Sequence, residues 1–253
     1  MAKRNPADVS WFLVGGRQIG GELTAFEDRV EAMVEQTETL GDAWTEQSYV
    51  GVRTAELTLD GFYNDAQGSI HDALNASADL APPICYTLEN STYGAGFVGW
   101  AAGAKQNYER LFSIGALHKV RSVYQTQGPV DYGKQLWFYK AASATGVSTA
   151  AAIDNGASTT GAAGYLQYNA TNGEANIRVI HSSDGISWAT LLTFTKTSSG
   201  VATGTFGAER VVTTAAVERY TAIDFSTATA TGGNATAGSL VFMVGLARNL
   251  STR

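Results

Sequence analysis

The sequence predicts a mainly β protein with one short α-helix. Apolar segments of strand length alternate with turn residues along the whole chain, which has 28 Gly but only 4 Pro. The apolar residues of a single segment, 65–76, are spaced clearly as in an amphipathic helix. The length of 253 residues fits either one large all-β domain or two domains of ordinary size.

The first half combines strands with that helix. Residues 11–14, Trp-Phe-Leu-Val, precede Gly15-Gly16 and are typical of a short strand and turn. Residues 55–60 alternate apolar and polar side chains, as a half-buried strand does. Asn64-Asp65 can cap the helix predicted over 65–76, and the apolar segment 84–88 predicts the next strand.

The rest of the first half is less regular. The glycines from Gly94 to Gly103 favour a flexible loop, and the apolar residues of 108–112 have the spacing of a second short helix. A hairpin is expected from segments 117–126 and 132–139, with its turn at Gly128-Pro129.

The second half predicts almost only strands, which points to a β-sandwich or jelly roll. Asn172-Gly173, Asp184-Gly185 and similar pairs supply the turns. No repeat with a period of 20–50 residues is visible. The expected strands are 163–169, 175–181, 189–195, 209–214, 219–225 and 239–246.

Composition and charge divide the chain near residue 140. The stretch 141–150 consists of small and polar residues typical of a linker, so we expect domains at 1–140 and 141–253. Residues 1–140 contain 11 Lys and Arg against 17 Asp and Glu, whereas residues 141–253 contain 6 of each. The net charge of −6 therefore belongs entirely to the first half. A protein that wraps nucleic acid would have the opposite sign.

The sequence holds no recognisable catalytic or metal-binding motif. The three histidines, His71, His118 and His181, lie far apart, and Cys85 lies within an apolar strand, where cysteine is usually buried. Glu35 and Asp42 are a formal carboxylate pair, but nothing separates them from their acidic neighbours. We therefore expect no enzyme activity, cofactor or metal. We also expect no membrane segment, because the best apolar run, 240–244, has only strand length.

Two parts of the chain carry a family resemblance. The segment 36–44, Gln-Thr-Glu-Thr-Leu-Gly-Asp-Ala-Trp, followed by the strand 55–60 and Gly61-Phe62-Tyr63, resembles the tail tube (major tail) proteins of long-tailed bacteriophages. The match covers roughly residues 9–140. The second half, notably 181–188, more weakly resembles a β-sandwich appended to some of these proteins, similar to jelly-roll and carbohydrate-binding modules.

The resemblance implies a structural protein of the virion tail, made in the host cytoplasm. Copies of the chain would close into rings, typically hexameric, that stack into a hollow tube through which DNA passes without specific binding. Tape-measure and tail-terminator proteins would be further partners. Residues 1–10 and 15–28 would become ordered only when rings stack. A ring of three double-barrel subunits, in which the second half replaces a second tube barrel, stays open as an alternative.

The wall of the tube would include residues 27–60. The best candidates for acidic side chains that line the lumen are Glu31, Glu35, Glu38 and Glu46. The alternation of Glu31, Met33 and Glu35 supports a strand there, although the spacing of Val30 and Val34 also fits a helix. An acidic bore would repel phosphate over about one Debye length, roughly 8 Å.

The aromatic residues leave a second function open. Trp44 and Phe62 are expected to pack in the core. Trp188 follows the Asp184-Gly185 turn and is a candidate for stacking on a sugar, although packing in the core or the turn is expected more often. The alternative function is therefore a β-sandwich protein that binds carbohydrate or a cell surface.

Overall fold

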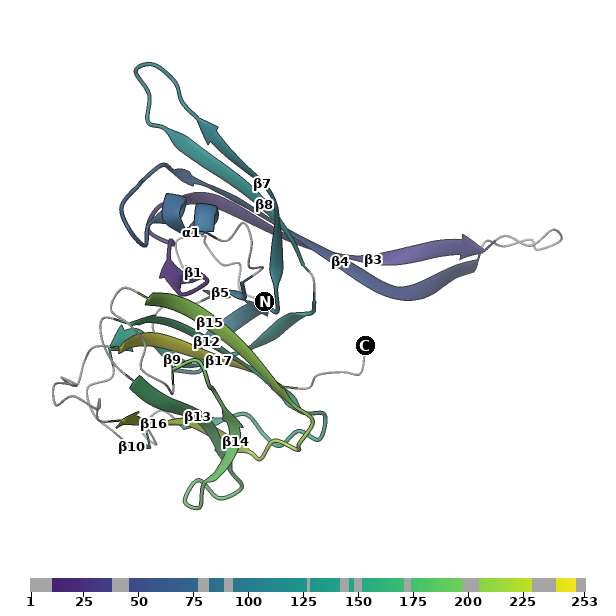
Figure 1. Cartoon of the computed structure of the whole chain (residues 1–253). Helices are drawn as coiled ribbons and strands as arrows, with labels where there is room; N and C mark the ends of the chain where they lie inside the picture. Colours follow the sequence, from purple (N-terminus) through teal and green to yellow (C-terminus); the bar gives the residue numbers. More distant parts are fainter. Residues whose placement is uncertain are drawn as a thin grey trace.

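The protein is mainly β, with one short helix, as the sequence predicts. The computed structural model describes residues 11–37, 46–76, 82–88, 93–126, 128–141, 146–147, 152–170, 174–197, 205–228 and 240–248. Within these ranges it has the helix α1 (Ile70–Ala76) and three sheets (Figure 1). None of the described helical segments is long and apolar enough to cross a membrane.

The largest sheet has eight strands in the order β15-β12-β17-β9-β6-β5-β1-β2. Its neighbouring strands pair antiparallel, and both sides of residue 140 contribute to it. The predicted boundary therefore lies at the end of β9, inside a continuous hydrogen-bonded sheet, and the division into two domains stays a prediction. The strands are β1 (Phe12–Val14), β2 (Arg17–Gln18), β5 (Ile84–Thr87), β6 (Gly96–Trp100), β9 (Val130–Ala141), β12 (Ala162–Ala170), β15 (Thr205–Thr213) and β17 (Leu240–Arg248).

This sheet curls into a nearly closed barrel. The turn between β1 and β2 crosses to the other end of the sheet, where the Gly16 amide donates to Oε1 of Gln167 in β12 at 2.6 Å. From β9, the Tyr139 hydroxyl donates to the Gly16 carbonyl at 3.0 Å. Gly16 has a φ of 89°, and a Cβ there would lie 2.3 Å from the carbonyl oxygen of Tyr168. Only glycine permits this approach. The interior is filled by Leu13, Cys85, Phe97, Ala163, Tyr165 and Met243.

The two smaller sheets cover the outside of the barrel. A five-stranded sheet, β10-β16-β13-β14 with β11 beside β16, packs against β9, β12 and β17 through a core that includes Trp137, Phe225 and Phe242. A four-stranded sheet, β3-β4-β8-β7, packs with α1 against β1, β5 and β6. The strands are β3 (Leu23–Thr37), β4 (Glu46–Phe62), β7 (Gly103–Leu111), β8 (Lys119–Thr126), β10 (Gly146–Val147), β11 (Ile153–Asp154), β13 (Glu174–Ser182), β14 (Ala189–Thr193) and β16 (Tyr220–Ala228).

Three local predictions for the first half are wrong. Segment 108–112 lies largely in β7, because pairing with β8 outweighs a helical spacing of three apolar residues. β8 and β9 are not a hairpin, since β8 pairs with β4 and β7 whereas β9 pairs with β6 and β17. Gly96 and Gly99 lie in β6, and a Cβ on Gly99 would lie only 2.7 Å from the Tyr165 ring, so glycine makes room for that ring.

Other predictions hold with shifted ends. The helix begins at Ile70 rather than 65, because residues 66–69 form a turn first. The described parts of segment 27–60 lie in β3 and β4, which pair antiparallel, so the strand interpretation is confirmed over the helical one. Residues 15–28 have a defined structure in the single chain, where Ile19 is fully buried. The prediction that this segment becomes ordered only when rings stack is therefore wrong. Residues 1–10 lie outside the described residues.

Candidate assembly surface

The four-stranded sheet ends in two long edge strands. β4 and β8 lie at its centre, and within the described residues neither β3 nor β7 pairs with a strand on its outer side. β3 has 15 residues and β7 has 9. In Figure 1 the β3–β4 and β7–β8 hairpins project from the body in different directions. An open strand edge presents unpaired N–H and C=O groups that can pair with another chain.

One face of this sheet is fixed to the body. Leu57 and Leu59 of β4 and Tyr124 of β8 are fully buried against the barrel and α1. On β3, Phe26 packs edge-on against Phe12, with ring centroids 5.4 Å apart. The Tyr86 hydroxyl donates to the Asp28 carboxylate, and burial raises the pKa of Asp28 above its usual value. These contacts fix the edge strand within the single chain.

The opposite face is open to solvent and carries more acidic than basic side chains. Strand alternation puts Thr58 and Asp60 on this face, opposite buried Leu57 and Leu59. Arg121 forms an ion pair with Asp60 at 3.6 Å, and Arg29 pairs with Glu31. By strand alternation and register, its charged residues are Glu27, Arg29, Glu31, Glu56, Asp60, Glu109, Lys119 and Arg121.

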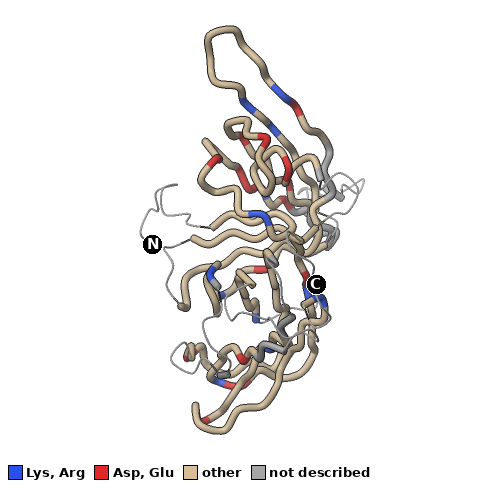
Figure 2. Tube along the Cα trace, turned by 60° about the vertical axis from the view of Figure 1, so that its left-hand side comes forward, with Lys and Arg blue, Asp and Glu red and all other residues tan. Residues whose placement is uncertain are grey.

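The helix is held beside this sheet by carboxylates. Glu22 accepts from the backbone N–H of Ile70 at 2.5 Å and from the Asn64 amide. Asp72 accepts from Arg17 at 2.8 Å. Partial burial would raise the pKa of Asp72, but the hydrogen bonds from Arg17 and the Gly68 N–H outweigh it and lower that pKa. Asp72 therefore stays charged at neutral pH. In Figure 2, several Asp and Glu residues lie below the long hairpin at the top of the molecule.

The predicted lumen residues fall on the β3–β4 hairpin where they are described. Glu31 is exposed on the open face of β3. The backbones of Glu35 and Glu46 lie in β3 and β4, opposite Ser48 and Thr37, respectively. Glu38 lies outside the described residues, as does Trp44. A lumen role is tested for none of the four acidic residues here and stays a prediction.

The structure adds acidic residues that the sequence analysis did not select. Glu56 and Asp60 alternate with buried Leu57 and Leu59, and Glu109 lies on the open face of β7. The alternation of apolar and polar residues over 55–60 could have predicted that Glu56 and Asp60 lie on the open face. The same alternation puts Phe62 on the open side, where it is 40% exposed, so its predicted core position is wrong.

The remaining candidates lie inside the protein or at the periphery of this sheet. Cys85 is buried in the barrel, as predicted, and burial raises the pKa of its thiol. His71 and His118 flank one aromatic cluster, with Tyr63 against His71 at 5.0 Å and Phe112 against His118 at 4.7 Å. The described residues contain no group of three His, Cys, Asp or Glu placed to hold a metal ion.

Comparisons with known proteins give partial structural likenesses. No family model matches the chain, and no curated protein matches it. A protein in the virion of a native gene transfer agent particle is 14% identical, with a TM-score of 0.42 over 51% of this chain and 98% of its own. A protein in the tail of an empty gene transfer agent particle with C6 symmetry is 14% identical, with a TM-score of 0.37 over 44% and 81%. The Dit protein of SPP1, titled a paradigm of the hub adsorption apparatus in phages infecting Gram-positive hosts, is 11% identical, with a TM-score of 0.31 over 93% and 98%.

Proposed function

We propose that the chain is a structural subunit of a phage-type tail tube. The observation that carries this proposal is the four-stranded sheet, which is anchored on one face, open on the other, and bounded by two long strands, β3 and β7, that pair with no further strand of the described residues. Pairing β3 of one copy with β7 of the next would turn an aggregation hazard into ring closure. The resemblance of residues 9–140 to tail tube proteins supports the same assembly.

In such a ring the open faces would form the inner wall. The excess of acidic side chains there would repel DNA phosphates, so that DNA passes without binding. Glu31, one of the four sequence-based candidates, lies on the described open face together with Glu27 and Glu56, and the other sequence-based candidates are Glu35, Glu38 and Glu46. Hexameric rings, location in the virion tail, and contacts with tape-measure and tail-terminator proteins follow from the resemblance. The role is structural rather than enzymatic.

Cysteine pairs across the two edges test ring closure. In one chain, β3 and β7 are separated by two strands, roughly 14 Å at the usual strand spacing, which a disulfide cannot bridge. Under oxidation, Glu27→Cys together with Asn107→Cys, or with Glu109→Cys for the other register, should give covalent ladders ending in a closed ring.

The control replaces the edge position by an interior one, since Thr58→Cys on β4 cannot meet β7 of another copy. Electron microscopy of the same concentrated samples should show hollow rings or tubes. Monomers without ladders in both registers, together with the absence of rings at all salt concentrations, would contradict the proposal.

The alternative function, carbohydrate binding, rests on Trp188. This side chain precedes β14 and is half-buried, whereas Trp100 and Trp137 are buried in the cores. An accessible ring face could stack on a sugar. Glycan-array binding that is lost in Trp188→Ala, from a protein that forms no rings, would favour this function over the tube.

A further inference from the structure

The two hairpins of the four-stranded sheet carry opposite net charges. Strands β3 and β4 together contain seven acidic and two basic residues, whereas β7 and β8 contain four basic residues and one acidic residue. The whole chain has a net charge of −6, so the positive β7–β8 hairpin is an exception within it. Since the strand order is β3-β4-β8-β7, the sheet is acidic toward its β3 edge and basic toward its β7 edge.

The charges of minority sign in each half have partners or opposite neighbours inside the chain. On β3, the cation Arg29 forms an ion pair with Glu31. On β7, the anion Glu109 lies opposite Arg121 in the register of the β7–β8 hairpin. Each half of the sheet therefore presents mainly its majority sign to another chain.

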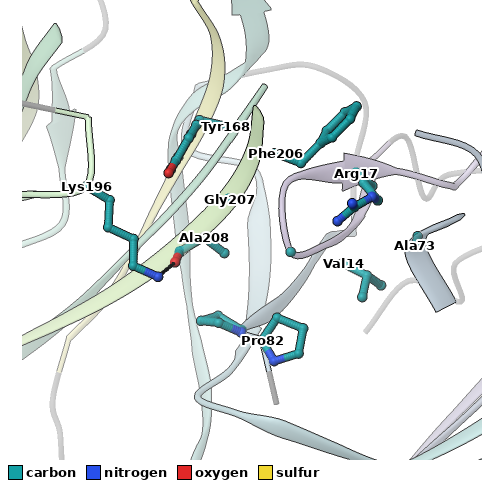
Figure 3. A pocket seen from close by; sticks show the side chains of 11 residues that line it. Val14, Arg17, Ala73, Pro82, Tyr168, Lys196, Phe206, Gly207 and Ala208 are labelled. Atoms are coloured by element: carbon teal, nitrogen blue, oxygen red, sulfur yellow. Dashed lines mark hydrogen bonds between the residues drawn. The ribbon is translucent and has the colours of Figure 1, made fainter. Parts of the chain in front are cut away.

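Two cations of the basic half remain available to an acidic partner. Arg110 and Lys119 are exposed, and neither forms an ion pair within the described residues. The two cations that line the cavity of about 370 Å³ in Figure 3 are already engaged, since Arg17 is in an ion pair and Lys196 donates to a backbone carbonyl at 2.7 Å. An acidic edge of another chain would therefore find its cations on the β7–β8 hairpin rather than at the cavity.

The base of the β7–β8 hairpin is held against the body, which gives its charges fixed positions. Phe112 packs on Tyr63 of its own chain, with ring centroids 5.7 Å apart. The Tyr108 hydroxyl is hydrogen-bonded to Nδ1 of His71 in α1. Beyond Phe112 the tip projects into solvent, and Ile114 is fully exposed. Charges that are fixed in this way lose little further freedom when a partner binds.

Backbone geometry alone does not decide which edges pair. Neighbouring strands of this sheet are all antiparallel, so β3 and β7 run in opposite directions. Joining β3 to β7 of another copy continues the antiparallel order, but a twofold pairing of β3 with β3, or of β7 with β7, is antiparallel as well. A twofold pairing is isologous and stops at a dimer, whereas β3–β7 pairing is heterologous and can close a ring.

We propose that the opposite charges of the two hairpins select the head-to-tail pairing of β3 with β7. In that pairing the acidic half of one sheet lies beside the basic half of the next, whereas pairing of like edges brings together two halves of the same sign. The charges act over about one Debye length, roughly 8 Å at physiological salt, so the adjoining strands act together rather than through one ion pair. This inference rests on the proposed function and adds what determines the partner of each edge.

Reversing the charge of each hairpin tests the selection. The basic-reversed variant, Arg110→Glu with Lys119→Glu, leaves β7 and β8 with two basic and three acidic residues. The acid-reversed variant combines Glu27→Lys, Glu31→Lys and Glu56→Lys, which leaves β3 and β4 with four acidic and five basic residues. In each variant both hairpins then have the same sign. Each variant alone should need at least about tenfold more protein to assemble in analytical ultracentrifugation.

Mixing the two variants separates charge selection from a loss of folding. Junctions between the two variants join unlike hairpins, so an equimolar mixture should assemble at the wild-type concentration. The matched control is Lys134→Glu against Lys119→Glu, because both lysines are exposed on strands and Lys134 lies on β9, outside this sheet. The control should assemble as the wild type does. A mixture that assembles no better than its components, although circular dichroism shows both to be folded, would overturn the selection.

The salt dependence of the wild type gives a readout that needs no variant. Raising the salt concentration from about 0.1 M to about 1 M shortens the Debye length from about 10 Å to about 3 Å, so assembly should weaken at least about tenfold. Rings that form equally well at both salt concentrations and in both reversed variants would overturn the charge selection and leave the ring proposal standing. Absence of rings and of cysteine ladders in every condition would overturn both.

Discussion

The two sheets that cover the barrel differ most at their edges. The five-stranded sheet ends in β10, with 2 residues, and β14, with 5, whereas the four-stranded sheet ends in β3, with 15, and β7, with 9. Short edge strands are a common protection against pairing with other chains, and long regular ones invite it. Among the described residues, the five-stranded sheet therefore offers only short edges for strand addition, whereas the four-stranded sheet offers two long ones.

The largest expected effect comes from cutting the chain between the two regions. A fragment of residues 1–140 loses β12, β15 and β17, so the barrel interior around Leu13, Cys85 and Phe97 is left open. We expect this fragment to show no cooperative thermal unfolding by circular dichroism, in contrast to the full chain. A sharp transition of the fragment would instead support two independently folding domains.

The next effect concerns the seam where the barrel closes. Gly16→Ala places a methyl group against the Tyr168 carbonyl and imposes a strained φ, so it should destabilise the protein by about 2 kcal/mol or more in urea unfolding. Gly156→Ala is the matched control, because Gly156 has a φ of 69° but open space around it. Equal losses in both variants would mean that the close approach at Gly16 contributes nothing.

The contrast between the edges predicts a change in assembly without a change in folding. Val30 is 42% exposed on the edge strand β3. The variant Val30→Lys puts a charge on this edge, and we expect that charge to prevent another strand from pairing with it. Its effect on unfolding free energy should stay within about 0.5 kcal/mol, as for most surface substitutions. Thr190→Lys on β14 should leave assembly unchanged in analytical ultracentrifugation. If both variants assemble alike, β3 is not the edge that is used.

The smallest effects are expected from two carboxylates with opposite pH behaviour. Burial raises the folded-state pKa of Asp28, so stability should fall as pH rises above the ordinary Asp value of about 3.9. Asp28→Asn should flatten this part of the profile, because an amide oxygen can still accept from Tyr86. Urea midpoints at pH 4 and pH 7 measure the change.

Asp184 provides the comparison on the other side of the barrel. It accepts from the N–H groups of Ser187 and Ile186, both at 2.8 Å, which lowers its pKa to about 2. Its contribution is present above the ordinary value and is lost as pH falls through about 2. Asp184→Ala should therefore leave the profile between about pH 5.5 and pH 7 parallel to that of the wild type, and should diverge from it only at lower pH. A changed slope there would contradict this assignment.

The sequence predicts local structure well where turn chemistry is clear. The strands expected at 163–169, 175–181 and 239–246 correspond to β12, β13 and β17 with ends shifted by one or two residues. Their alternating or continuous apolar patterns are local properties. The pairing of β9 with β17, rather than with β8, joins residues about a hundred positions apart, and no local pattern encodes it.

The candidate surface was predictable only in part. The acidic hairpin and Glu31 follow from charge and alternation, because both are visible in a short window. The open edges of β3 and β7 depend on the order of strands in the sheet. The exposure of Ile114 between β7 and β8 was not predicted, because the spacing of Tyr108 and Leu111 favoured a helix there. Exposure of an apolar residue is a property of the fold rather than of the segment that contains it.

If the chain assembles as proposed, the place of β17 in the barrel would also determine when a newly made chain becomes competent to do so. β9 ends at Ala141, but its neighbour β17 begins only at Leu240, so the sheet stays incomplete until nearly all of the described chain has left the ribosome. Pairings over such separations form late, because loop closure costs entropy before it is compensated. Nascent chains on one messenger would therefore hold their β3 and β7 edges on an unfinished core. Polymerisation of the proposed subunits would therefore be delayed until β17, the last barrel strand of the described chain, has been translated.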